Sequence, residues 1–164
     1  MRSLGGKAAG WPLATITVIL ALMAVSCAQE AGGGAGGSVD VTLQEWAVVP
    51  AQTSVAAGSV TFNVENTGPD HPHELVVIRT DLSPDALPTT DEGAVDEEGE
   101  GIEIIGEVEE FAPGETRQVT FDLVPGSYVL VCNVKPGEEH GDEHMGGMEV
   151  HYKMGMFAAL TVEE

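Results

Sequence analysis

The strongest constraint on the fold is a series of short segments in which apolar and polar residues alternate. Residues 39–46 (VDVTLQEW) and 59–66 (SVTFNVEN) both alternate with a period of two, and the second segment places Val60, Phe62 and Val64 on one face. This period is typical of strands with one face in a core. Further strands are expected from runs bounded by Gly, Pro and Asn turns, at residues 52–57, 75–78, 102–108, 116–123, 128–133 and 156–162. We therefore expect an all-β, Greek-key sandwich or barrel of seven to eight strands.

Two long insertions interrupt this pattern. In the first, residues 80–115, Ser83 and Pro84 offer the cap and first position of one turn of helix. Residues 91–100 are strongly acidic and poor in large apolar side chains, which predicts a solvated loop. The second insertion, residues 133–150, is rich in His and Met.

The N-terminal 28 residues have the layout of an export signal. A positive start with Arg2 and Lys7 precedes a 13-residue apolar run (13–25) and a group of small residues. The segment AVSC ending at Cys27 resembles a lipoprotein cleavage box, so we expect lipidation of Cys27; simple cleavage after Ala28 is the alternative. A Gly-rich linker follows up to residue 38 and would tether a domain at 39–164 to the membrane.

The mature chain would be strongly acidic. Loss of Arg2 and Lys7 from the six basic residues leaves four against 27 acidic ones, a net charge of −23. Such a surface repels nucleic acid and would attract a partner with a basic docking surface. Solubility or adaptation to a saline habitat is the alternative explanation.

A metal-site pattern lies at the ends of three predicted strands. Cys132 ends one strand, His151 and Met156 precede the last one, and His73 begins an earlier one. Two imidazoles, a thiolate and a weak axial thioether are what a mononuclear electron-transfer copper site requires. Cys132 is also the one cysteine left in the exported domain, where an unpaired thiol is a liability unless a metal occupies it. A buried, inert cysteine is the alternative.

These motifs resemble those of the cupredoxins, the small blue-copper proteins of the plastocyanin and amicyanin type. The resembling segments are NTG at 66–68 with HELVV at 73–77, PGSYVLVCN at 125–133, and His151-x4-Met156 followed by a strand. The resemblance implies a cupredoxin-like domain over 39–164 that holds one copper ion with His73, Cys132, His151 and Met156. It also implies that neighbouring amide side chains fix the ligands, for which Asn66 and Asn133 are candidates; ordinary turn asparagines are the alternative.

The sequence departs from the family pattern between the cysteine and the second histidine, where 18 residues intervene. Within that insertion, His140 and Met145 repeat the offset of His151 and Met156, so they form an alternative ligand pair. We favour His151 and Met156 because Met156 directly precedes the final strand.

The sequence thus predicts an exported, lipid-anchored blue-copper protein that carries single electrons between redox partners in the cell envelope. A copper-binding protein that buffers or delivers the metal without redox work is the alternative. We expect no enzyme activity, since five histidines on one domain are too few for a multicopper cluster and no hydrolase nucleophile motif is present.

Overall fold

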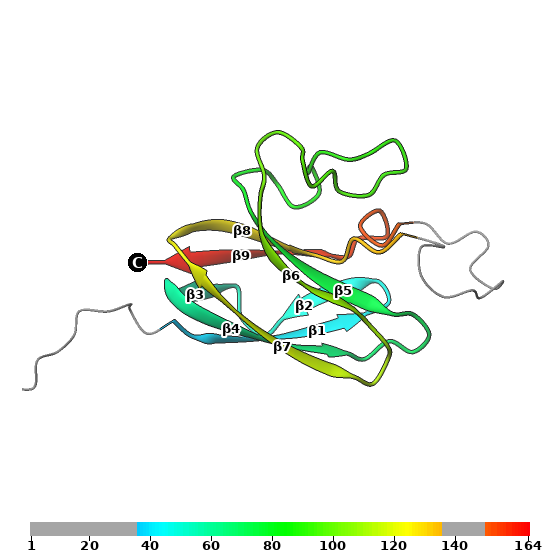
Figure 1. Cartoon of the computed structure of the whole chain (residues 1–164), viewed down its shortest axis with the longest axis horizontal. Coiled ribbons are helices and arrows are strands. Elements are labelled where there is room, and N and C mark those ends of the chain that lie inside the picture. Colours follow the sequence, from blue (N-terminus) through cyan, green and yellow to red (C-terminus); the bar gives the residue numbers. More distant parts are fainter. Residues whose placement is uncertain (1–35, 136–149) are drawn as a thin grey trace, which may run out of the picture. The chain divides into compact units, whose positions relative to one another are not determined.

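The computed structural model describes residues 36–135 and 150–164, and in these residues the protein consists of strands and connecting loops (Figure 1). One sheet has the order β2-β1-β4-β7 and is called sheet A. The other has the order β3-β9-β8-β5-β6 and is called sheet B. The strands are β1 (Ser38–Gln44), β2 (Ala47–Pro50), β3 (Ser54–Ala56), β4 (Gly58–Asn66), β5 (His73–Arg79), β6 (Glu103–Phe111), β7 (Thr116–Leu123), β8 (Gly126–Val131) and β9 (Phe157–Glu163). The expected all-β sandwich is confirmed, with nine strands in the described residues rather than seven or eight.

Both sheets are mixed. The pairs β1–β4 and β3–β9 are parallel, whereas the other neighbouring strands run antiparallel. The described residues contain no helix that is long and apolar enough to cross a membrane.

The main core lies between the two sheets. Val60, Phe62 and Val64 of β4 are fully buried in it, as their alternation predicts. Leu75 and Val77 of β5 face them from the other sheet.

A second apolar cluster covers the outer face of sheet B. Val76 and Ile78 of β5 lie in this cluster and are as buried as their neighbours on the inner face. This explains why β5 is apolar without alternation, since a strand buried on both faces needs apolar residues at every position. Its cover comes from Leu87, Ala94 and Val95, all within the connection between β5 and β6.

One expectation about that connection was wrong, and a second held only in part. The segment at Ser83 and Pro84 makes a turn closed by Ala86 N–H donating to Ser83 O, and no helix forms there. The acidic stretch 91–100 is not fully solvated, because Ala94 and Val95 are buried against the sheet. Its charged side chains face solvent while its two apolar residues complete the second cluster.

Candidate metal centre

Antiparallel pairing brings the four predicted ligands to one end of sheet B. The register pairs Val131, the last residue of β8, with Val76 of β5 and Phe157 of β9. Because β8 runs opposite to both neighbours, its C-terminal end meets the N-terminal ends of β5 and β9. His73 begins β5, Cys132 follows β8, and His151 and Met156 lie just before β9.

Three donor atoms converge at this end. His151 Nδ1 lies 3.2 Å from Cys132 Sγ and 3.2 Å from His73 Nδ1, and Cys132 Sγ lies 3.7 Å from His73 Nδ1. All three side chains are buried, with at most 1% of their surface exposed. They form the one group of this kind within the described residues that could hold a metal ion.

The three atoms enclose a point at metal-bonding distance. The three separations place the point equidistant from them about 2 Å from each atom, close to zinc–imidazole bonds of about 2.0–2.1 Å. A donor set of two imidazoles and one thiolate, without a carboxylate, excludes the oxygen-preferring cations Mg²⁺ and Ca²⁺. The residues present therefore fit a soft or borderline metal ion.

Met156 lies in the same part of the core as Cys132. Its side chain is fully buried, and its backbone forms hydrogen bonds with the backbones of Cys132 and His151. Cys132 N–H donates to Met156 O at 3.0 Å, and Met156 N–H donates to His151 O at 3.2 Å. Two histidines, a cysteine and a methionine are the donor set of mononuclear electron-transfer copper sites. The four residues therefore fit one copper ion.

Burial sets the protonation of the metal-free site. It lowers the pKa of His73 and of His151 to about 4, so both imidazoles are neutral at physiological pH. It raises the pKa of the Cys132 thiol to about 12, against the lowering effect of a hydrogen bond from Glu74 N–H. The histidines are thus ready to bind a cation, and the thiol must release its proton to do so.

Glu45, which the sequence analysis did not single out, lies next to Nε2 of His73. Its Oε1 accepts hydrogen bonds from the backbone N–H groups of Asp70 and His71 and lies 3.8 Å from His73 Nε2. Burial acts to raise the pKa of this carboxyl, but backbone hydrogen bonds, with those of His71 and Asp70 the largest, together with the interaction with His73 outweigh it, so the pKa lies below its ordinary value. An ionised carboxylate therefore faces the nitrogen of His73 that points away from Cys132.

Trp46 packs over the two histidines. Its ring centroid lies 5.1 Å from that of His151 and 6.4 Å from that of His73. It also stacks on His71, with the ring centroids 5.1 Å apart. Because Pro72 interrupts the strand after His71, the sequence by itself predicts an exposed His71 side chain, but the structure packs this side chain half-buried against Trp46.

Neither candidate asparagine bonds to the sulfur in the described structure. Asn66 is fully buried, and its Nδ2 donates to His71 O and Phe111 O, so it fixes the chain that leads into His73. Asn133 bonds instead to the connection between β5 and β6, at Val95. The sulfur accepts from Glu74 N–H at 3.5 Å, and the Glu74 carboxylate in turn accepts from Asn133 N–H.

Three residues of the sequence-based assignment lie outside the described residues. These are His140 and Met145, the alternative ligand pair, and Cys27, the expected lipidation site. The choice between His151 and His140 stays a prediction, although it is His151 that the structure places beside Cys132 and His73.

Comparison with known proteins gives structural relatives only. No protein-family model matches the sequence, and no curated protein matches it either. An auracyanin from the photosynthetic bacterium Roseiflexus castenholzii, solved in the dithionite-reduced form, superposes with a TM-score of 0.50 at 19% identity over 77% of this chain and 97% of that one.

The protein has the cupredoxin fold. Similar structures include an azurin from Methylomonas sp. strain J (20% identity, 77% and 98% coverage, TM-score 0.49) and auracyanin A, a "blue" copper protein from Chloroflexus aurantiacus (21%, 77% and 98%, 0.47). In this cupredoxin fold, His73, Cys132, His151 and Met156 lie together at one end of sheet B.

Proposed function

We propose that this protein is an exported one-electron carrier whose redox centre is a single copper ion bound by His73, Cys132, His151 and Met156. The observation that carries the proposal is the buried triangle of His73 Nδ1, His151 Nδ1 and Cys132 Sγ, with separations of 3.2–3.7 Å. Copper bound there supplies a one-electron couple. A rigid, buried donor set suits that role because it limits the rearrangement between the two oxidation states.

Each described side chain has a part in this proposal. The two imidazoles are neutral at pH 7 and suit both oxidation states of the metal, whereas the Cys132 thiolate offsets the charge of the cation. Trp46 packs against both histidine rings, which are at most 1% exposed to solvent.

The cellular setting is proposed from the sequence. The export signal at 1–28 and the lipoprotein-like Cys27 support a location in the cell envelope, tethered to the membrane through a lipid anchor. The net charge of −23 in the mature chain supports a redox partner with a basic docking surface. We infer no enzyme activity.

The proposal is tested by titrating the protein with Cu(II) while recording visible absorption and electron paramagnetic resonance spectra. We expect an intense thiolate-to-copper band at one equivalent, lost in Cys132→Ser and in His151→Ala. His140→Ala is the matched control and should retain the band.

Two results would contradict parts of this assignment. Loss of the band in His140→Ala, with its survival in His151→Ala, would move the second imidazole ligand into the 133–150 insertion. Colourless binding that survives Cys132→Ser would instead support the alternative function, a protein that buffers or delivers copper without redox work.

A further inference from the structure

The connection between β5 and β6, residues 80–102, contacts two of the three peptide segments that carry ligand candidates, those of Cys132 and His151. It leaves sheet B after Arg79 and returns at Glu103, the residue paired with Arg79 in the sheet. Between these points it folds over the outer face of β5 and β8, where Leu87, Ala94 and Val95 are buried. This segment is green in Figure 1.

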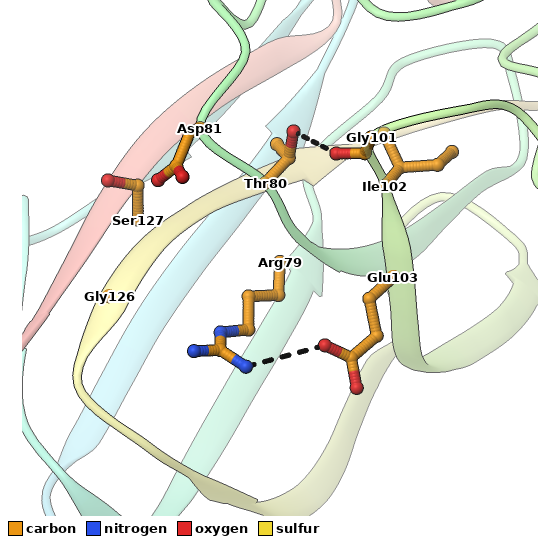
Figure 2. Close-up of a pocket in the computed structure, with 8 residues that line it drawn as sticks. All are labelled: Arg79, Thr80, Asp81, Gly101, Ile102, Glu103, Gly126 and Ser127. Atoms are coloured by element: carbon orange, nitrogen blue, oxygen red, sulfur yellow. Dashed lines mark hydrogen bonds and ion pairs between the residues drawn. The ribbon is translucent and has the colours of Figure 1, made fainter.

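The base of the segment is closed by Thr80. Its buried hydroxyl donates to Gly101 O at 2.7 Å (Figure 2). The same hydroxyl accepts from Leu82 N–H at 3.0 Å. Arg79 and Glu103 also approach each other here, with 3.5 Å between Nη1 and Oε2. The polar pocket drawn in Figure 2 lies at this base, at the opposite end of β5 from His73, and is separate from the metal centre.

The middle of the segment is cross-linked by backbone hydrogen bonds. Thr89 and Val95 form an isolated β-bridge, and Asp96 N–H donates to Pro88 O at 2.9 Å. Thr90 N–H donates to Ala94 O at 2.8 Å. The segment is therefore a small folded unit in which the backbone around Val95 is hydrogen-bonded to residues 88–90.

Asn133, the residue after Cys132, binds this unit through three hydrogen bonds. Its Oδ1 accepts from Val95 N–H at 2.7 Å, and its Nδ2 donates to Val95 O and to Glu97 Oε1, each at 3.2 Å. Asn133 is only 6% exposed, so water cannot readily take the place of these hydrogen-bond partners, and losing them would cost free energy.

Tyr152, the residue after His151, binds the same unit at a second point. Its hydroxyl donates to Pro84 O at 2.9 Å and accepts from Leu87 N–H at 3.1 Å. The ring is buried in the second apolar cluster and packs on Phe157, with centroids 5.4 Å apart. The next residue, Lys153, lays its side chain against the backbone of Gly93.

We propose that the 80–102 segment is a brace that fixes the spacing between the Cys132 and His151 segments, so that metal binding and the order of the brace are thermodynamically coupled. The inference rests on the proposed function only in requiring a metal ion at His73, Cys132 and His151. Each of the last two residues is followed by the side chain that anchors it to the brace. The brace thereby holds the two donor atoms at bonding distance from a common point before the metal arrives.

Coupling of this kind is reciprocal. If an ordered brace raises metal affinity, metal binding must stabilise the brace by the same factor. The amides of Leu87 and Val95 report on this directly, because their N–H groups donate to Tyr152 and Asn133.

The first test compares Tyr152→Phe with Tyr128→Phe in copper(I) affinity measured by competition with a chelator. Both substitutions remove one hydroxyl from a buried tyrosine, and Tyr128 donates to Val124 O at the other end of β8. We expect Tyr152→Phe to weaken copper(I) binding about tenfold or more, in the range found for groups that orient metal ligands. Tyr128→Phe should bind as the wild type does.

The second test needs no variant. Hydrogen exchange of the Leu87 and Val95 amides is measured by nuclear magnetic resonance in the metal-free and the copper(I)-loaded wild-type protein. Loading should slow both by about tenfold, a typical coupling factor, relative to the amide of Thr120 in β7.

The outcomes separate the two proposals. Tight copper(I) binding with equal affinities in the two tyrosine variants, or with unchanged exchange at Leu87 and Val95, would overturn the brace and leave the proposed function standing. A wild-type protein that binds no copper(I) would overturn both.

Discussion

The carboxylate of Glu45 lies 3.8 Å from Nε2 of His73, on the side of the imidazole ring opposite Cys132. Both Glu45 Oε2 and His73 Nε2 are buried and lack a hydrogen-bond partner among the described residues. Binding a metal through Nδ1 places the imidazole proton on Nε2, where this carboxylate is the nearby acceptor. The unpartnered Nε2 of His73 would thus gain an acceptor in the Glu45 carboxylate, whose Oε1 lies nearest to it, once His73 is a ligand.

Glu45→Gln should therefore lower the affinity of the site for Cu(II) and change its reduction potential. It keeps an oxygen for the N–H groups of Asp70 and His71 but removes the charge behind His73. We expect Cu(II) affinity to fall about ten- to a hundredfold. Because the lost charge stabilised Cu(II) more than Cu(I), the reduction potential should rise, by about 59 mV for each tenfold change in the ratio of the two affinities.

The control is Glu163→Gln, which makes the same change at an exposed position at the end of β9. Voltammetry of the two variants distinguishes a local effect from a general change in net charge. Equal shifts in both would show that Glu45 has no special relation to His73.

Glu74 makes the stability of the metal-free protein depend on pH. Burial raises the pKa of its carboxyl to about 7, Asn133 N–H opposes this, and the nearby carboxylates of Glu107, Glu97 and Glu110 add to it. The folded state therefore holds a proton that the unfolded chain releases above its own pKa of 4.5. The corresponding stabilisation is complete below pH 4.5 and is lost as the pH rises through about 7.

Glu74→Gln should remove this dependence, since glutamine keeps an oxygen for Asn133 N–H and carries no charge. Relative to the wild type, the variant should gain up to about 3 kcal/mol of unfolding free energy between pH 4.5 and 8. Denaturant unfolding of the metal-free proteins at several pH values measures the difference. Titration of His73 and His151 affects both proteins and cancels. A difference that stays constant across this range would contradict the assignment.

Metal binding should release about one proton per ion at pH 8.5. The two histidines are already neutral there, because burial lowers the pKa of each to about 4, whereas burial keeps the Cys132 thiol protonated by raising its pKa to about 12. Only the thiol then has a proton to lose on binding.

Calorimetric titration with copper(I) in buffers of different ionisation enthalpy gives the proton count. Cys132→Ser should release none, while His151→Ala should bind more weakly and still release one. A wild-type count near zero would show that the thiolate is not a ligand.

Much of this architecture could be predicted from local sequence patterns, namely the alternation of apolar residues and the positions of turn residues. The alternation of Val60, Phe62 and Val64 fixes which face of β4 is buried, and turn residues mark most strand ends. β2 was missed because its four residues end in Pro50 and show no alternation; it forms by pairing with β1 at the edge of sheet A. His73, Cys132, His151 and Met156 could be proposed because each adjoins a recognisable strand.

Contacts between distant residues could not be predicted in this way. Composition suggested that residues 91–100 are solvated, but Val95 is buried in the second apolar cluster and its backbone is bound by Asn133, 38 positions away. Glu45 has no spacing relation to His73 and is brought to it only by the packing of sheet A, whose strand β1 it follows, against sheet B. Glu74 could have been noticed, since the N–H of the residue after a metal-binding histidine is well placed to reach a neighbouring ligand.

Asn66 should matter mainly for the stability of the chain that leads into His73. Its side chain makes two buried hydrogen bonds, to Phe111 O and from Gly68 N–H, and a part-buried one to His71 O. Asn66→Ala should therefore lower the free energy of unfolding by about 3 kcal/mol, since each buried group left without a partner costs about 1–3 kcal/mol. The control is Asn63→Ala on the same strand, whose hydrogen bonds to Asp40 and Gln118 lie on the surface and whose loss should cost within about 0.5 kcal/mol. Denaturant unfolding of the metal-free variants measures both values, and equal costs would show that the buried bonds of Asn66 do not hold this segment.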